Sequence, residues 1–293
     1  MKRSVLNSPR LLELKKHRRR AVFKKIFLSL FGLLAIFSLL VYLSRLNSLN
    51  INEVKILGDK VTDTEVIKKI VEEQISGKYL WLFPKTNIFF YPQNTIKNEL
   101  QDKFKRLNNV NLSIKNNKVL ELSLTERVAK YTWCGIVSPP TKLGDQPCYF
   151  MDENGYIFDE APYFSGTVYF KFYGVQSESS FSKQNFKQLI AFKDVLLSLG
   201  LKPMALYITN NGEVEIFLSR GVSSVLTSEP KIIFKIEADF QNVIENLETA
   251  LNTEPLKSKF KNKYSSLLYI DLRFGNKVYD KFSAQGGPAS GGQ

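Results

Sequence analysis

The sequence predicts an α+β fold that follows an N-terminal transmembrane helix, and three features support this. An uncharged apolar run occupies residues 26–43, two segments with helical periodicity come next, and alternating apolar residues then dominate. We therefore expect five parts in chain order, namely a basic tail (1–25), a transmembrane helix (26–44), a first domain (48–127), a mostly antiparallel β domain with two helices (128–282) and a disordered tail (283–293).

The positive charge of the chain is concentrated at its N-terminus. The formal net charge is +13, and the first 25 residues, with ten basic and one acidic side chain, supply +9 of it. The remainder is nearly balanced, so the basicity does not indicate nucleic-acid binding. Basic residues stay on the cytoplasmic side of a membrane span and also attract anionic lipid, so we expect a cytoplasmic N-terminus and an extracytoplasmic bulk.

The apolar run Ile26–Leu43 is long enough to cross a bilayer. As a helix it rises roughly 27 Å, close to the thickness of the hydrocarbon core, which is about 30 Å. A cleaved signal peptide is one alternative, but its shorter apolar core ends at a small-x-small site, which Tyr42–Arg45 does not offer. A buried helix of a soluble protein is another, but its apolar residues would form a stripe.

The first domain should contain one strand, two helices and a hairpin, in that order. A strand ending at Gly58 precedes a capping box with Thr62 at the N-cap and Glu65 at N3. Asn116-Asn117 separates two alternating segments and predicts the hairpin turn. The residues that should face the core are Val66, Ile67, Ile70, Val71 and Ile75 in the first helix, Ile96, Leu100 and Phe104 in the second, and Val110, Leu112, Ile114, Leu120, Leu122 and Leu124 in the hairpin.

The second domain should alternate strands with two amphipathic helices. Asn154-Gly155 and Asn210-Asn211-Gly212 indicate hairpin turns. The predicted helices span Ser182–Gly200 and Phe234–Leu251. The predicted strands are Val128–Trp133, Tyr149–Met151, Tyr156–Phe158, Val168–Tyr173, Ala205–Ile208, Val214–Leu218, Leu268–Arg273 and Lys277–Tyr279.

Cys134 and Cys148 both fall outside the membrane in this topology, where disulfides persist. The residues between them include Pro139, Pro140, Gly144 and Pro147, so the segment can fold back on itself. A disulfide and two unpaired thiols both remain open. Two cysteines and the cytoplasmic His17 cannot build a standard zinc site outside, and we expect no cofactor.

Catalytic motifs are weak. The outer region contains no histidine, which excludes Ser-His-Asp and Cys-His arrangements there, and no glycine-rich phosphate loop is present. We therefore expect no enzyme and no small-molecule substrate. An extracytoplasmic cell-wall enzyme remains the alternative, because any two carboxylates can meet in a fold.

A C-terminal strand edge is the best candidate for partner binding. A peptide can extend an exposed edge through main-chain hydrogen bonds, and the segment Tyr269–Tyr279 is well placed to be such an edge. The alternatives are core packing for Tyr269, Leu272 and Val278, and an intramolecular partner for Arg273, such as Asp271 or Glu237.

Four segments resemble the FtsQ/DivIB family of bacterial cell-division proteins. Ile51–Gly58 and Leu120–Arg127 look like the first and last strands of the family's POTRA (polypeptide-transport-associated) domain. Cys148–Phe158 is similar to its Asp-Glu-Asn-Gly hairpin, and Tyr269–Phe274 to its C-terminal signature. The chain departs from the family at Val128, where many relatives have proline.

The resemblance implies a non-enzymatic divisome scaffold in the cytoplasmic membrane at the division septum. Such a protein binds FtsB/DivIC-like and FtsL-like bitopic proteins and regulates septal peptidoglycan synthesis, while its POTRA edge near Val54–Leu57 contacts other divisome proteins. Arg273 would pair with an acidic residue of the partner, Phe274 with apolar ones, and Phe282 would add an aromatic contact. The implied contact residues are Tyr269, Ile270, Asp271, Leu272, Arg273, Phe274, Lys277, Val278, Tyr279 and Phe282. A transport-associated POTRA protein is a further alternative, although that class usually has tandem repeats or a following barrel.

Overall fold

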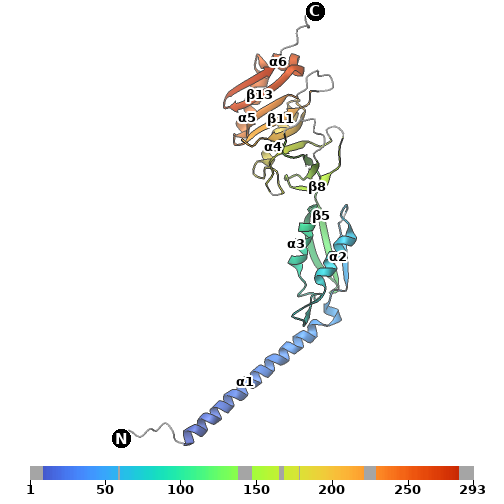
Figure 1. Cartoon of the computed structure of the whole chain (residues 1–293), viewed down its shortest axis with the longest axis vertical. Coiled ribbons are helices and arrows are strands. Elements are labelled where there is room, and N and C mark those ends of the chain that lie inside the picture. The colour runs from blue at the N-terminus through green and yellow to red at the C-terminus, as the bar shows by residue number, and fades with distance from the viewer. Residues whose placement is uncertain are drawn as a thin grey trace, which may run out of the picture. The chain divides into compact units, whose positions relative to one another are not determined.

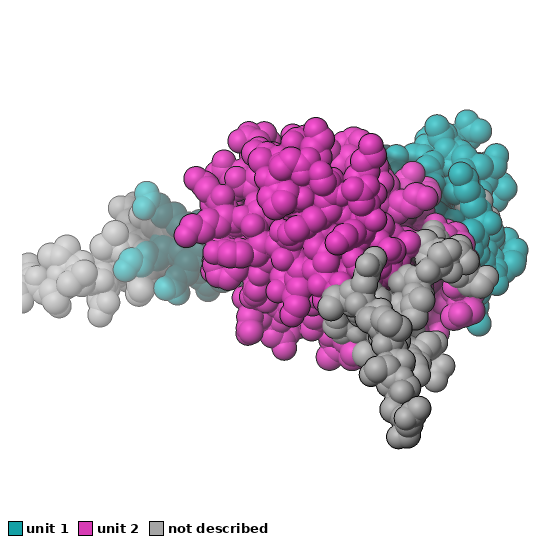
Figure 2. Space-filling model, turned by 90° about the horizontal axis from the view of Figure 1, so that it is seen from above, with its two compact units in different colours: residues 1–126 teal, residues 127–293 magenta. Residues whose placement is uncertain are grey.

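The chain divides into two compact units, residues 1–126 and 127–293 (Figure 2). The expected domain boundary lies one residue from this division. The C-terminal tail that was expected to be disordered lies outside the described residues from position 284 onward. The computed structural model describes residues 9–58, 60–137, 147–164, 168–177, 179–220 and 229–283.

Unit 1 begins with the long helix α1, Pro9–Ser44, drawn in blue in Figure 1. Its part Lys15–Ser44 is long and apolar enough to cross a membrane, and the most apolar 18-residue window of this part contains no buried residue. The helix therefore contains the whole predicted span and continues into the basic tail. A single 3₁₀ turn, η2 (Asn47–Leu49), follows it.

The rest of unit 1 is a small sheet covered on one face by two helices. Its strands lie in the order β1-β5-β4, with β1 parallel and β4 antiparallel to β5. Alternate residues of the strands pack with the apolar residues of α2 and α3 in one core. The elements are β1 (Glu53–Leu57), α2 (Thr64–Ile75), β2 (Lys78–Tyr79), β3 (Phe83–Pro84), α3 (Gln93–Lys103), β4 (Leu107–Lys115) and β5 (Val119–Glu126).

The local signals of unit 1 predicted β1, α2, α3, β4 and β5 but not the β2–β3 hairpin, and Val66, which was expected in the core, is 39% exposed. Asn116 and Asn117 adopt positive φ angles of 52° and 56° in the β4–β5 turn, as an Asn-Asn hairpin requires. The prediction that Thr62 caps α2 is wrong by one residue. The N-cap is Asp63, whose carboxylate accepts a hydrogen bond of 2.9 Å from the Glu65 N–H.

Unit 2 is built on a nine-stranded sheet in the order β14-β13-β12-β11-β10-β9-β6-β7-β8. Most neighbours are antiparallel, and the parallel pairs are β6–β9, β9–β10 and β12–β13. The elements are β6 (Tyr131–Trp133), β7 (Cys148–Met151), β8 (Ile157–Ala161), β9 (Lys171–Gly174), α4 (Phe186–Ser198), β10 (Pro203–Ile208), β11 (Glu213–Leu218), β12 (Lys231–Lys235), α5 (Phe240–Asn252), α6 (Leu256–Lys263), η3 (Tyr264–Ser266), β13 (Leu267–Phe274) and β14 (Lys277–Phe282).

The core of unit 2 lies between one face of this sheet and the helices α4 and α5. Ile216, Ile232 and Ile270 point from neighbouring strands into the same cluster as Phe192 and Leu247 of the helices. In each strand, the residues directly before and after these core residues point to the opposite side of the sheet, because successive side chains of a strand alternate. We call this opposite side the outer face.

Two helix predictions in unit 2 are corrected by the structure. The predicted helix Phe234–Leu251 begins too early, because Lys231–Lys235 forms β12, paired with both β11 and β13. The helix itself, α5, starts at Phe240 after its N-cap Asp239. The expectation of two helices in this domain is also wrong, because α6 is a third.

Candidate partner-binding edge

The C-terminal hairpin of unit 2 ends the sheet. Strands β13 and β14 are antiparallel, and Gly275, with φ of 61°, lies in the tight turn between them. β14 is the terminal strand in the sheet order, and among the described residues no strand pairs with its other side. A terminal strand presents backbone N–H and C=O groups to which another chain can hydrogen-bond.

Part of the predicted contact set belongs to the core. Ile270 and Leu272 are buried, and Val278 and Phe282 are partly buried against the same cluster. Core packing, the alternative considered for Leu272 and Val278, therefore describes their positions in the structure. Tyr269 is half-buried on the outer face, where it pairs with Lys231 and Lys281 across the strands. These residues support the edge from within the sheet.

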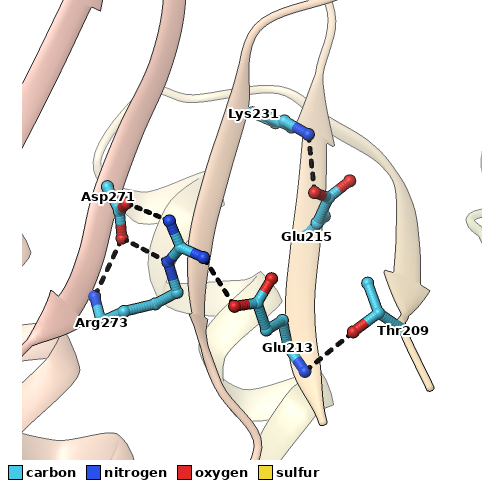
Figure 3. A network of polar contacts seen from close by, with 6 residues as sticks. All are labelled: Thr209, Glu213, Glu215, Lys231, Asp271 and Arg273. Carbon is cyan, nitrogen blue, oxygen red and sulfur yellow. Dashed lines mark hydrogen bonds and ion pairs between the residues drawn. The ribbon is translucent and has the colours of Figure 1, made fainter. Parts of the chain in front are cut away.

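Arg273 lies between two carboxylates on the outer face (Figure 3). Its Nε and Nη2 atoms donate to Oδ1 and Oδ2 of Asp271 at 2.9 and 2.6 Å, and its backbone N–H donates to Oδ1 at 3.1 Å. The Nη1 atom donates to Oε1 of Glu213 in β11 at 2.6 Å. The predicted intramolecular partner Asp271 is thus present, and Glu213 takes the place suggested for Glu237.

This bidentate pairing explains how Asp271 keeps its charge although only 7% of its side chain is exposed. Burial raises the pKa of Asp271, but the hydrogen bonds and charge of Arg273 outweigh it and hold the pKa below its usual value. The hydrogen bonds to Asp271 and Glu213 raise the pKa of Arg273. The next strands carry a further ion pair, Lys231 to Glu215 at 2.6 Å (Figure 3).

Beside this network, an exposed cluster occupies the end of the hairpin. Phe274 is 55% exposed and Tyr279 50% exposed, and their rings meet edge to face with centroids 5.3 Å apart. The Arg273 guanidinium lies 5.6 Å from the centroid of the Phe274 ring. Lys277, opposite Phe274 in the ladder, is also exposed. We call Arg273, Phe274, Lys277 and Tyr279 the hairpin cluster.

The structure adds two residues to the predicted site. Lys281 is exposed and follows Tyr279 on the same side of β14, so Lys277, Tyr279 and Lys281 form one row. Lys281 could have been found from the sequence, because it lies two positions after Tyr279 and four after Lys277, and alternate residues of a strand share one side. Glu213 precedes Arg273 by 60 positions, and no local pattern predicts that long-range pairing.

Two other predicted features lie away from this hairpin. Cys134 and Cys148 are joined in a disulfide that connects the end of β6 to the start of β7. In unit 1, the predicted edge Val54–Leu57 belongs to β1, which ends the three-stranded sheet.

Neither a cofactor site nor a known relative identifies the chain. Within the described ranges, no group of three or more His, Cys, Asp or Glu side chains is arranged to hold a metal ion. No protein-family model matches the sequence, and a search of curated proteins found no significant match either. The features of the chain that bear on its function are the apolar helix α1 and the β14 edge.

Proposed function

We propose that this chain is a single-pass membrane scaffold of the FtsQ/DivIB type, with its N-terminus in the cytoplasm and both folded units outside. It acts at the division septum without catalysing a reaction itself. Its outer part captures FtsB/DivIC-like and FtsL-like bitopic proteins and so regulates septal peptidoglycan synthesis. The basic tail followed by an unburied apolar helix supports this topology.

The arrangement of unit 1 supports a POTRA-type domain. Apart from the short β2–β3 hairpin, its elements follow the order strand, helix, helix, strand, strand. The last strand, β5, lies between β1 and β4, so both outer strands are open to further pairing. The β1 edge is the surface we assign to other divisome proteins.

The observation that carries the proposal is the terminal strand β14 with its exposed row of Lys277, Tyr279 and Lys281. Backbone pairing supplies affinity for an extended peptide, and the side chains on alternate positions select it. A row of lysines around an aromatic ring favours a partner strand that combines acidic and apolar residues. Lysines on an edge also discourage indiscriminate pairing with other strands.

The test compares binding of the full chain, in detergent micelles, to the outer segment of the FtsB/DivIC-like protein of the same cell. Phe274→Ala combined with Tyr279→Ala should weaken binding about tenfold or more, because exposed aromatic anchors dominate interface energies. Tyr163→Ala is the matched control, since Tyr163 is also an exposed aromatic residue of unit 2, at 84%. Equal affinity of the double variant and the control would remove this edge from the interface.

Arg273 is a poor choice for that test. Arg273→Glu would place a third carboxylate between Asp271 and Glu213, so a loss of binding would not separate a lost contact from a damaged fold. Lys277→Glu is the better charge variant, because Lys277 is exposed in the turn region of the hairpin. It should weaken binding of an acidic partner without lowering the stability of unit 2.

A further inference from the structure

The short hairpin β2–β3 of unit 1 exposes large apolar residues at its tip. Leu80, Trp81 and Leu82 connect the two strands, and the first two are 83% and 89% exposed. Phe89 and Phe90, which follow in the same loop region, are 73% and 51% exposed. Such a group of large apolar side chains on a small domain indicates an interaction surface.

The backbone of this tip makes the choice of residues more unusual. Leu80 and Trp81 have φ angles of 47° and 65°, in the left-handed region that asparagine and glycine adopt most easily. The tip therefore carries bulky residues at positions where both backbone conformation and exposure to water disfavour them. Violations of local rules of this kind concentrate at functional sites.

The hairpin is docked on the end of α1. The Phe83 ring meets the Phe37 ring of α1 edge to face, with centroids 5.9 Å apart. Arg45 Nε donates to the Leu82 carbonyl at 3.2 Å. The Ser44 carbonyl, at the end of the helix, accepts hydrogen bonds from the side chains of Asn50 and Asn87, both at 3.0 Å. These contacts hold the hairpin beside the helix.

The docking position determines how deep the hairpin lies. Phe37 precedes the helix end, Ser44, by seven residues, which corresponds to ~10 Å along the axis. Phe37 also belongs to the apolar run Ile26–Leu43. If that run occupies the hydrocarbon core, a ring in contact with Phe37 lies within the outer leaflet rather than in the water above it.

Cationic residues border the apolar tip. Lys78 and Lys85 flank the hairpin, and the Lys85 ammonium lies 5.7 Å from the centroid of the Tyr79 ring. Arg45 lies at the junction with α1. Aromatic rings with lysine or arginine beside them are typical of the level of the lipid headgroups, where the rings reach toward the acyl chains and the cations meet phosphates.

We propose that the β2–β3 hairpin inserts Leu80 and Trp81 into the outer leaflet of the membrane that α1 spans. The occupant of this surface is phospholipid, because the hairpin packs directly on the apolar helix and shares its depth. The inference rests on the proposed membrane span. Its consequence is a second attachment of unit 1 to the bilayer, which limits rotation of the unit about the end of α1.

Tryptophan fluorescence tests this in vesicles containing phosphatidylglycerol and phosphatidylcholine, with bromine atoms near the glycerol end of the acyl chains. Trp81 is one of two tryptophans, so Trp133→Phe leaves it as the only tryptophan of the full chain. Emission from Trp81 should fall about twofold relative to unbrominated vesicles, because an indole at headgroup level lies close to these bromines. Unchanged emission would overturn the proposal.

One further variant keeps the result interpretable. Trp133 donates a hydrogen bond to the Gly174 carbonyl, so its loss could disturb unit 2, and we therefore also compare the native chain with Trp81→Phe. The quenched part of the native emission should disappear in Trp81→Phe, and its persistence would contradict the inference.

The span itself is tested separately with Phe31→Trp in a chain that also carries Trp81→Phe and Trp133→Phe, using bromines near the chain ends. If Phe31→Trp is quenched but Trp81 is not, the hairpin proposal fails and the span stands. If neither is quenched, both fail. If the emission of Trp81 is unaffected by brominated lipid and changes only when a bitopic partner protein is added, the surface binds protein and the lipid assignment is overturned.

Discussion

Three consecutive backbone N–H groups hold the carboxylate of Glu126 in unit 1. The Lys60, Val61 and Thr62 amides donate to it at 3.1, 3.1 and 2.9 Å, just before helix α2. Burial alone would raise the pKa of Glu126, but these bonds lower it to about 2. One residue of β5 thus ties the end of the sheet to the loop that starts α2.

The neighbouring Arg127 makes the equivalent attachment in unit 2. Its Nη1 atom donates to Oδ2 of Asp152 at 2.6 Å, and its guanidinium lies 3.8 Å from the centroid of the Tyr156 ring. The Glu-Arg pair that contributed to the family resemblance therefore anchors one side chain in each unit, directly at the boundary between them.

Glu126→Gln should destabilise unit 1 by about 1 kcal/mol, a value that allows for the partial exposure of this carboxylate. Hydrogen exchange of the α2 amides during urea unfolding of the detergent-solubilised chain measures the unfolding of unit 1 separately from that of unit 2. Because the pKa of Glu126 in the folded chain, about 2, lies below the usual value of 4.5, its carboxylate stabilises unit 1 fully above pH 4.5. This stabilisation should shrink as the pH falls toward 2.

The control is Glu72→Gln on the exposed side of α2, which should leave the urea midpoint unchanged. A difference between Glu126→Gln and the native chain that stays constant from pH 6 to pH 3 would contradict the assigned role.

At the scale of elements, the disulfide joins the end of β6 to the start of β7 across a segment whose middle, residues 138–146, lies outside the described structure. Cys134 is buried, and β6 pairs with both β7 and β9, so the bond closes a loop within the sheet. This is a place where cross-linking restricts the unfolded chain more than the folded one.

Replacing both cysteines with serine should lower the free energy of unfolding of unit 2 by about 3 kcal/mol, the loop-closure value for a cross-link of this length. Hydrogen exchange of the β7 amides during urea unfolding measures it. Cys148→Ser alone should have a similar effect, because either change removes the bond. A double variant as stable as the oxidised native chain would show that the cross-link does not contribute.

Elements with one clear local period could be predicted from the sequence, and those without one could not. The β4–β5 hairpin follows from strict alternation around Asn116-Asn117. Strand β12 is not predicted, and its last two residues fall within the predicted helix Phe234–Leu251. The reason is that Ile232, Ile233 and Phe234 are all buried, which removes the alternation of a half-exposed strand. Helix α6 was missed because its sequence is rich in lysine, with Leu256 as its buried residue.

The candidate site shows the same limit. The predicted contact set Tyr269–Phe274 does not separate the core residues Ile270 and Leu272 from the outer ones. The Glu213 partner of Arg273 depends on the order of β11, β12 and β13 in the sheet. The β2–β3 hairpin escaped prediction because its strands have two residues each and its tip is Leu-Trp rather than a turn-forming pair. Local sequence patterns of a few residues do not reveal pairing between distant residues or the proposed contact with lipid.

In the whole molecule, we propose that each region has one task. Helix α1 and the β2–β3 hairpin attach the chain to the membrane, unit 1 offers the β1 edge to partners, and unit 2 offers β14. A partner anchored in the same bilayer is then confined near these edges, which raises its effective concentration and allows a modest interface to suffice.

The role of β14 as the partner-binding edge is tested by backbone hydrogen exchange of the full chain in nanodiscs, with and without the outer segment of the FtsB/DivIC-like partner. Strand addition should slow exchange at alternate amides within Lys277–Phe282, because only every second N–H group points away from β13. Strand β8, at the opposite end of the sheet, should be unchanged. Slowing at β8, or none in β14 at saturating partner, would contradict the proposal.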